Sequence, residues 1–250
     1  MKLTIDGRVA TILIDRQERR NALDNAALEA LIDATETLRR SGVVAAVVSG
    51  AGDRAFSAGS DLKALATYPP AEVAHHTYLF QKCTQALDAL NVATIAAIEG
   101  FCLGGGLELA LTCDYRVSSA ASTFGFPEIR LNAVPSGGGT FRAVRAMGLT
   151  RAREMLLFGG RIDAETALQR NLVSEIVAPG TAHARAMELA EALAAQVAPL
   201  TIALVKGAIL GGVEASASAG NALAYFADLA VSQSGDYRQG IMGFAEKTKA

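Results

Sequence analysis

Two glutamates in this chain stand where a carboxylate has few polar neighbours. Glu108 follows a run of three glycines, residues 104–106, and has leucine on either side, while Glu128 follows Pro127. A carboxylate that is buried among apolar side chains must find a partner or change its pKa. Taken singly, Glu108 is explained by the dipole of the helix it begins, and Glu128 by a solvated loop. Taken together, the two form a plausible general acid and base.

Two glycine-rich turns accompany these glutamates. Residues 56–63 (FSAGSDLK) follow the apolar segment 43–49, and residues 100–108 (GFCLGGGLE) follow the apolar segment 92–98. Ligands of α/β folds collect at the carboxyl ends of strands, where a helix begins with unpaired N–H groups. One such turn alone would be explained as a tight turn, and neither turn fits a dinucleotide or phosphate-loop motif. Two turns side by side could direct two N–H donors at one oxygen and so form an oxyanion hole.

The elements that must position these residues follow from the apolar spacing. A strand pair with a turn at Asp6-Gly7 is predicted within residues 1–15. Strands and helices then alternate, which predicts an α/β fold with parallel strands and right-handed crossovers. Buried strands are predicted over residues 43–49, 92–98 and 115–117, and helices over residues 25–40, 61–65, 71–90 and 107–111.

The last quarter of the chain has a different character. From about Thr181 onward it is rich in alanine, leucine and glutamate and is expected to be almost entirely helical. We therefore expect a core region over residues 1–193 and a helical region over residues 194–250. The small apolar residues of 215–224 cannot form a core alone, so these helices are expected to pack on the body or on another subunit.

Composition excludes several classes of protein. The chain has 250 residues, of which 51% are hydrophobic and 19% charged, with a formal net charge of −2. This indicates a folded globular protein without an electrostatic reason to bind nucleic acid or an anionic membrane. The first 15 residues alternate polar and apolar side chains, and no apolar stretch is long enough to span a bilayer. We therefore expect a cytoplasmic location.

Cysteines and histidines give no sign of a metal site. The cysteines are odd in number, and no C-x-x-C, H-E-x-x-H or G-x-S-x-G motif occurs, so a disulfide framework, a zinc site and a serine triad are not expected. These cysteines are interpreted as reduced core residues. The cysteines are Cys83, Cys102 and Cys113, and the histidines are His75, His76 and His183.

Six segments in order resemble the enoyl-CoA hydratase/isomerase (crotonase) superfamily over nearly the whole chain. They are residues 16–23, 58–63, 104–108, 127–128, 134–140 and 226–247. Each segment alone is a weak signal, but the ordered set is specific. The resemblance implies a spiral of ββα units, a C-terminal helical trimerisation region, a homotrimer or a hexamer made of two trimers, and an acyl-CoA thioester as substrate. It implies no cofactor beyond the coenzyme A of the substrate, and no metal.

The same resemblance implies roles for single residues. The backbone N–H groups of Ser60 and Gly105 would bind the thioester oxygen, Glu108 would deprotonate water for attack at Cβ, and Glu128 would exchange the proton at Cα. Lys206 and Lys247 are candidates for the coenzyme A phosphates. The residues implied to cradle coenzyme A are Ala22, Ala58, Asp61, Leu62 and Lys63.

Some residues depart from the resemblance and leave alternatives open. Ser136 stands where hydratases commonly carry glycine and some isomerases and ring-forming synthases carry aspartate, while Asn132 and Phe141 would lie near the acyl pocket. Gln239 replaces a frequent glutamate. The favoured function is hydration of 2-enoyl-CoA, and the nearest alternatives are an enoyl-CoA isomerase or another acyl-CoA lyase of the same superfamily. A non-catalytic binding protein is a remote alternative, since a binder does not need both glutamates and RNA binding would require a basic surface.

Overall fold

The main sheet has six strands and carries the predicted alternation of strands and helices. The computed structural model describes residues 1–247, with the side chains of residues 214 and 244–247 excepted. β1 pairs with β2 in antiparallel fashion, and every other neighbouring pair of this sheet is parallel. In spatial order the strands are β1 (Lys2–Asp6), β2 (Val9–Ile14), β3 (Ala45–Gly50), β5 (Ala93–Ile98), β7 (Tyr115–Ser119) and β10 (Glu175–Val177).

A second sheet of short strands lies next to the first, and the sequence patterns did not predict it. β4, β6 and β8 each follow a strand of the main sheet directly, so the chain repeats a strand–strand–helix unit. Both glycine-rich segments therefore contain a strand, where the sequence indicated only a turn between a strand and a helix. Three residues are too few to show an alternating pattern. The strands are β4 (Ala55–Ser57), β6 (Phe101–Leu103), β8 (Thr123–Gly125) and β9 (Arg161–Asp163).

Ten α-helices and two 3₁₀ helices are found among residues 1–247. The predicted helices are confirmed to within one or two residues at most ends, whereas α5 and α6 had no predicted counterpart. The α-helices are α1 (Asn25–Arg39), α2 (Leu62–Leu65), α3 (Pro70–Asp88), α4 (Gly105–Ala110), α5 (Gly139–Phe158), α6 (Ala164–Gln169), α7 (Ala182–Gln196), α8 (Pro199–Glu214), α9 (Ala217–Ser232) and α10 (Gly235–Lys247). The 3₁₀ helices are η1 (Gln17–Arg19) and η2 (Pro127–Leu131).

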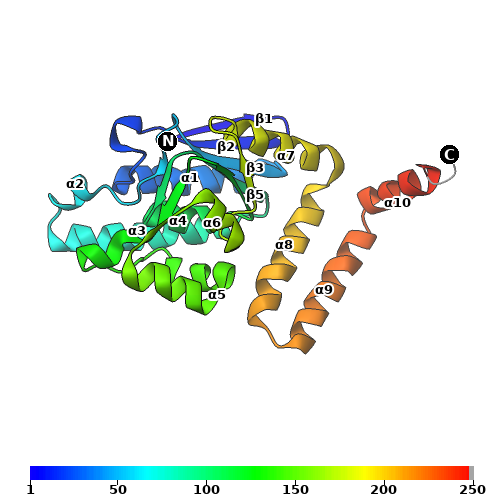
Figure 1. The fold of residues 1–250 in the computed structure, drawn as a ribbon. Coiled ribbons are helices and arrows are strands. Elements are labelled where there is room, and N and C mark those ends of the chain that lie inside the picture. The colour runs from blue at the N-terminus through cyan, green and yellow to red at the C-terminus, as the bar shows by residue number, and fades with distance from the viewer. Residues whose placement is uncertain (248–250) are drawn as a thin grey trace.

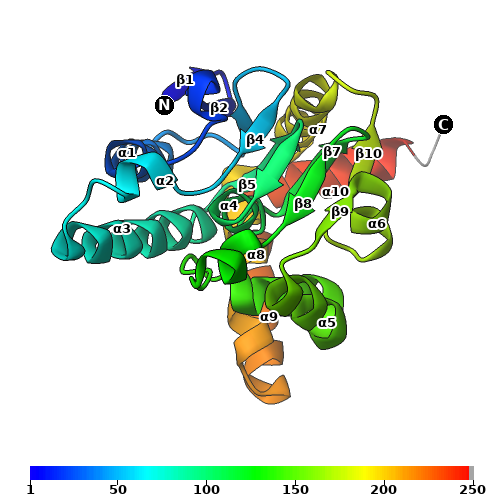
Figure 2. The same cartoon turned by 60° about the vertical axis from the view of Figure 1, so that its left-hand side comes forward.

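Helices cover both faces of the main sheet. α1 and α3 lie side by side on one face (Figure 2), where leucines of α1 and Phe80 of α3 join the larger hydrophobic core. α7 lies against β3, β5 and β7 on the other face. It presents a buried alanine every four residues, Ala182, Ala186, Ala190 and Ala194, so its backbone can approach the sheet closely.

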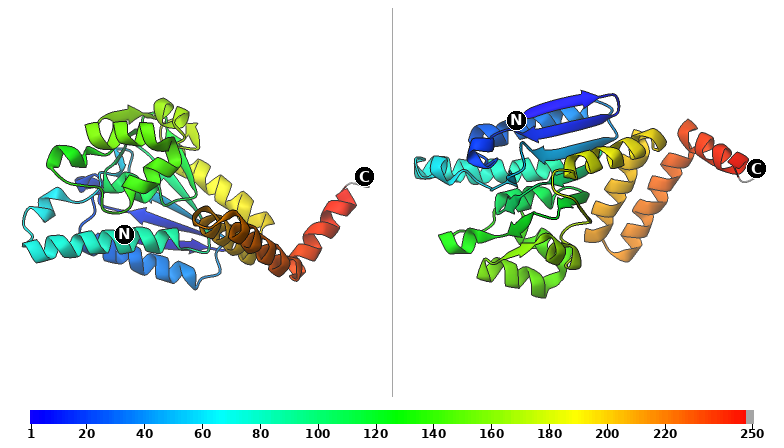
Figure 3. Two further views of the ribbon diagram at one scale, coloured as in Figure 1. Left: turned by 90° about the horizontal axis from the view of Figure 1, so that it is seen from below. Right: turned by 45° about the horizontal axis from the view of Figure 1, so that its top comes forward.

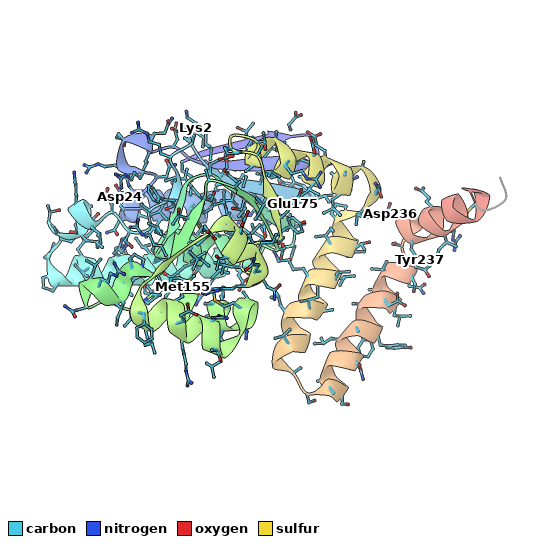
Figure 4. The ribbon with its side chains drawn as sticks, in the orientation of Figure 1. Lys2, Asp24, Met155, Glu175, Asp236 and Tyr237 are labelled. Carbon is cyan, nitrogen blue, oxygen red and sulfur yellow. The ribbon has the colours of Figure 1, made fainter. Side chains whose placement is uncertain are left out.

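The last three helices extend away from the body. α8 and α9 pack against each other as an antiparallel pair, and α10 turns away from them (Figures 1 and 3). Asp236 and Tyr237 mark the start of α10 at a distance from the sheets (Figure 4). Large apolar side chains of these helices are exposed, among them Val213 at 65%, Tyr225 at 64% and Phe226 at 64%. The division at residue 193 stays a prediction, and Leu193 itself lies within α7.

Lys206 of α8 does not lie in a position to meet the phosphates of coenzyme A, so that prediction is wrong. Its Nζ lies 2.8 Å from Asp114 Oδ2 and 3.2 Å from the carbonyl oxygen of Val92, and the residue is only 8% exposed. A buried ammonium must be paired, and Asp114 provides that pair. Lys206 therefore attaches α8 to β5 and β7. Lys247 ends α10, but its side chain lies outside the described residues.

No single helix among the described residues is both long and apolar enough to cross a membrane. The bent pair Ala182–Gln196 and Pro199–Val213 passes the same test by length and composition, with an angle of 111° between its halves. Within this pair, the alanines of α7 are buried against the main sheet.

Candidate active site

A cavity of about 480 Å³ lies where the second sheet meets the helices that follow it. It is lined by Ala58, Gly59, Ser60, Leu62 and Leu65 after β4, by Gly104, Gly105 and Glu108 after β6, by one face of α3 near His76, and by η2 with the loop that follows it. The carboxyl ends of two parallel strands thus open into one space, as the glycine-rich turns predicted. Ser60, Gly105, Glu108 and Glu128 all line this cavity.

The two glycine-rich turns touch through their backbones. Gly59 has a φ of +89°, and a Cβ there would lie 2.9 Å from the backbone nitrogen of Gly105. Only glycine permits this conformation and this approach. Leu23 holds the turn from the other side, because its N–H donates to Gly59 O and its carbonyl accepts from the N–H of Asp61, both at 2.8 Å. Within the described residues, the N–H groups of Ser60 and Gly105 have no acceptor, so both remain available to an oxygen in the cavity.

Glu108 lies in the first turn of α4 and is 2% exposed. Its Oε1 accepts a hydrogen bond of 2.7 Å from the backbone N–H of Gly139, at the start of α5. Burial raises the pKa of Glu108, while the N–H groups of Gly139, Gly137 and Ser136 and the charge of Arg142 oppose that rise. The carboxylate is thus held by amides on one side, and its charged form is partly stabilised.

Arg142 fixes the loop that carries these amides. Its Nη1 donates to the carbonyl oxygen of Gly137 at 2.7 Å, and its Nη2 donates to Asp88 Oδ2 at 2.9 Å. Arg142 is 9% exposed, and its bond to Gly137 is buried, whereas its bond to Asp88 is partly exposed. Sequence patterns gave no sign of this role, because Asp88 is 54 residues away along the chain.

Glu128 faces the cavity from the first turn of η2, and its surroundings favour the protonated carboxyl group. Its Oε2 is buried and has no hydrogen-bond partner among the described residues. Burial raises the pKa of Glu128 to about 7, and the negative charge of Glu108 adds to the rise. A Cβ on Gly104 would lie 2.9 Å from Glu128 Oε1, so a side chain at position 104 would displace this carboxyl group. Two carboxyl groups of different proton affinity therefore share one cavity.

Replacing Glu128 with glutamine should stabilise the fold, and more so as pH rises. The folded pKa of about 7 lies above the reference value of 4.5, so the folded state binds this proton more tightly than the unfolded state. The free energy of unfolding therefore falls as pH rises from about 4.5 to about 7. We expect Glu128→Gln to gain about 1 to 2 kcal/mol over wild type at pH 8, and little at pH 4, since this carboxyl is partly exposed.

Denaturant unfolding of both proteins at pH 4 and pH 8 measures this difference. Glu165→Gln, which changes an exposed glutamate in the first turn of α6, serves as the control. An equal effect of Glu128→Gln at the two pH values would contradict the raised pKa.

A sequence profile described as enoyl-CoA hydratase/isomerase matches residues 4–250. The chain belongs to the enoyl-CoA hydratase/isomerase family. It is similar to the short-chain-enoyl-CoA hydratase of Clostridium acetobutylicum, with 31% identity over 245 residues that cover 98% of this chain and 94% of the relative. It is also similar to enoyl-CoA hydratase domain-containing protein 2, mitochondrial, of Bos taurus, with 34% identity covering 96% of this chain and 82% of the relative.

Solved structures confirm the fold of this family member. The crystal structure of enoyl-CoA hydratase from Bacillus anthracis superposes with a TM-score of 0.94 and 31% identity, covering 99% of this chain and 97% of that one. The structure of Pseudomonas aeruginosa DspI superposes with a TM-score of 0.93 and 33% identity, covering 98% and 94% of the two chains. The predicted resemblance to the crotonase superfamily and the α/β fold are therefore both confirmed.

Not all residues expected to cradle coenzyme A line the cavity of this family member. Ala58 and Leu62 do, beside Ser60 and Gly105. The side chain of Asp61 instead accepts hydrogen bonds from the backbone N–H groups at the start of α2 and pairs with Arg16. The carbonyl of Ala22 accepts a hydrogen bond from the same arginine, and Lys63 is exposed outside the cavity wall. Their contact with a substrate stays a prediction.

The residues that depart from the family pattern lie in different places. Ser136 lines the cavity. Asn132 ends η2 in a left-handed conformation, between the cavity residues Leu131 and Ala133. Phe141 lies outside this cavity. Its ring borders a neighbouring hollow that Ser136 also lines, and it lies 4.7 Å from the guanidinium carbon of Arg142.

His76 is a cavity residue that sequence reasoning considered only for a metal site or a serine triad. It is 4% exposed, and its ring nitrogens lie 2.8 Å from Asn25 Oδ1 and 2.9 Å from Ser60 Oγ. The available signal was its helical spacing with buried residues of α3 such as Phe80. That spacing indicates burial, but it does not name the partners, which lie 51 and 16 residues away.

Proposed function

We propose that this protein adds water across the double bond of 2-enoyl-CoA thioesters. The observation that carries the proposal is a single cavity that holds two carboxyl groups of different proton affinity and two backbone N–H groups without an acceptor among the described residues. Relatives with 31% and 34% identity are named as an enoyl-CoA hydratase and a hydratase domain-containing protein, which supports the same chemistry. The 2-enoyl-CoA substrate is part of the proposal.

In this mechanism the N–H groups of Ser60 and Gly105 bind the thioester oxygen. When a nucleophile attacks Cβ, the electron pair of the double bond moves toward that oxygen and an enolate forms. Amides fixed in advance stabilise this developing charge without reorganising, and one such donor typically contributes ~3 kcal/mol. Gly59 and Leu23 hold the Ser60 turn in place, so the donors are positioned before the substrate arrives.

Glu108 and Glu128 divide the proton transfers between them. Glu108 accepts a proton from water while the water oxygen forms its bond to Cβ. Glu128, which carries its proton near neutral pH, donates it to Cα, and the enolate electron pair forms the new C–H bond. The products are a 3-hydroxyacyl-CoA, a protonated Glu108 and an ionised Glu128. Glu108 then releases its proton to solvent and Glu128 takes one up, which restores both groups.

The proposal extends to cofactors and assembly. Addition of water changes no net oxidation state, and the amides and carboxyl groups of the chain perform every step above, so we propose that coenzyme A enters only as part of the substrate. We also propose a homotrimer, or a hexamer of two trimers, in which the exposed apolar faces of α8 and α9 are covered. A cytoplasmic location remains a prediction from the sequence.

Incubation with 2-enoyl-CoA thioesters of increasing chain length tests the proposed function. Loss of the absorbance of the conjugated thioester, with formation of the 3-hydroxyacyl-CoA, is the expected result. Migration of the double bond without hydration at every chain length would instead identify an isomerase. Binding without any turnover would identify a non-catalytic protein.

A further inference from the structure

One turn of α3 contacts both residues whose N–H groups face the cavity. His76 and Phe80 are four residues apart and therefore project from the same face of the helix. Phe80 lies directly against Gly105, since a Cβ on that glycine would come within 2.3 Å of the ring carbon Cζ. His76 reaches Ser60 through a hydrogen bond of 2.9 Å. A single helical turn thus supports the two amides, which follow two different strands, β4 and β6.

The hydrogen bonds of His76 determine which of its nitrogens carries the proton. Asn25 Oδ1 can only accept, so the Nδ1 of His76, at 2.8 Å, must donate. Burial holds the pKa of His76 below its usual range, although Asp24 opposes this, so the neutral ring is favoured. The Nε2 of a neutral ring with Nδ1 protonated is an acceptor, and Ser60 Oγ–H therefore donates to it. Both ring nitrogens are occupied, which leaves His76 without a free proton to exchange with a substrate.

The bond to His76 adds to the backbone hydrogen bonds that hold the Ser60 turn, which contains the conformationally permissive Gly59. Gly59 has a φ of +89°, and a glycine at this position allows the peptide between residues 59 and 60 to rotate at low cost. Leu23 N–H holds the carbonyl end of that peptide at 2.8 Å. Beyond the N–H, the backbone is held by the bond from Asp61 N–H to Leu23 O at 2.8 Å, and the bond from Ser60 Oγ to His76 adds an attachment at the side chain of Ser60 itself. The direction of that N–H is then fixed from both sides.

We propose that His76 is a positioning residue that sets the direction of the Ser60 N–H by accepting a hydrogen bond from the Ser60 hydroxyl, with Asn25 fixing its ring. This inference rests on the proposed use of that N–H to bind a thioester oxygen. The chemistry that it serves is stabilisation of the enolate and not binding of the substrate in its ground state. Loss of the contact should therefore lower kcat more than it changes KM.

Four variants distinguish an effect of the hydrogen bond between Ser60 and His76 from an effect of simple packing. His76→Phe keeps a ring but cannot accept a hydrogen bond, and Ser60→Ala removes the hydroxyl and keeps the N–H. Both should lower kcat for hydration by ~10- to 100-fold, as expected for a displaced donor, with KM within about threefold of wild type. In His76→Gln the amide oxygen can replace Nε2, so kcat should recover to within about threefold of wild type. His75→Phe, at an exposed neighbour on α3, should leave kcat unchanged.

A second measurement does not depend on turnover. A 3-ketoacyl-CoA such as acetoacetyl-CoA forms an enolate with its own absorbance band, and an oxyanion hole should raise the enolate fraction on binding. We expect this rise in wild type and His76→Gln, and a rise at least ~10-fold smaller in equilibrium constant in His76→Phe and Ser60→Ala. Enolate formation in wild type without hydration of any 2-enoyl-CoA would refute the hydratase function and leave the role of His76 standing.

The role of His76 would be overturned by either of two results. The first is a wild-type kcat and enolate fraction in His76→Phe. The second is a His76→Gln variant that is no better than His76→Phe in both measurements, because packing and not the hydrogen bond would then explain the loss. Thermal unfolding of all variants shows whether a low kcat follows from a smaller folded fraction, and rates are compared per folded protein.

Discussion

Glu128→Gln is expected to lower kcat for hydration of a 2-enoyl-CoA by ~10²- to 10⁴-fold. Glutamine keeps the shape of the side chain but has no proton to donate to Cα at an accessible pKa. The cavity and both N–H donors stay in place, so KM should change by less than about threefold. Steady-state kinetics at pH 7 measure both quantities. Glu165→Gln, at an exposed glutamate, is the matched control and should behave as wild type.

The pKa of Glu128 also predicts the direction in which kcat/KM should change with pH. Hydration requires Glu128 to carry its proton in the free enzyme, and its pKa is about 7, so kcat/KM should fall as pH rises above about 7. The reverse reaction requires the ionised group to remove the Cα proton, so its kcat/KM should fall as pH drops below about 7. In the residual activity of Glu128→Gln, neither the fall of forward kcat/KM above about pH 7 nor the fall of reverse kcat/KM below about pH 7 should be present. Near wild-type hydration by that variant would remove Glu128 from the mechanism.

Glu108→Gln is expected to lower hydration by a similar ~10²- to 10⁴-fold and to leave exchange at Cα intact. The amide at position 108 cannot take a proton from water, whereas Glu128 and the N–H groups of Ser60 and Gly105 do not depend on it. The glutamine oxygen can still accept the 2.7 Å hydrogen bond from Gly139, so the loop geometry is preserved. Loss of conjugated absorbance measures hydration.

Deuterium uptake by a saturated acyl-CoA, followed by mass spectrometry in heavy water, measures proton exchange at Cα. The variant should exchange at a rate within about tenfold of wild type, since the charge of Glu108 is the smallest of the causes that shift the pKa of Glu128. Loss of both activities in a folded protein would show that the two carboxyl groups act as one unit. Retained hydration would exclude Glu108 as the residue that activates water.

The glutamates and the two turns could be predicted because their signals are local. A glutamate next to three glycines at the end of a buried segment, as at Glu108, already indicates a carboxyl group near unpaired amides. The ordered matches to one superfamily then placed Ser60, Gly105 and Glu128 in the same site. The strands of the main sheet were equally visible, since each contributes five or six residues except β10.

The remaining features depend on contacts between distant residues. β4 and β6 are three residues long, too short to alternate visibly, so the apolar pattern did not reveal the second sheet, which only the ββα units of the family resemblance implied. Lys206 has apolar neighbours in the sequence, but nothing there shows that Asp114 pairs with it across 92 residues. The bond between His76 and Ser60 likewise exists only once α3 has packed beside the turn that follows β4. These residues determine how firmly the site is held, which a local pattern does not reveal.

The central claim is that water adds to an enolate-forming thioester through two separate carboxyl groups. The most direct measurement is mass spectrometry of the product formed from a short 2-enoyl-CoA in heavy water enriched in oxygen-18. The account predicts a 3-hydroxyacyl-CoA with labelled oxygen at Cβ and a solvent deuterium at Cα in wild type, and almost none of it in Glu108→Gln or Glu128→Gln. An unlabelled product with a migrated double bond, or full labelling in either variant, would contradict it.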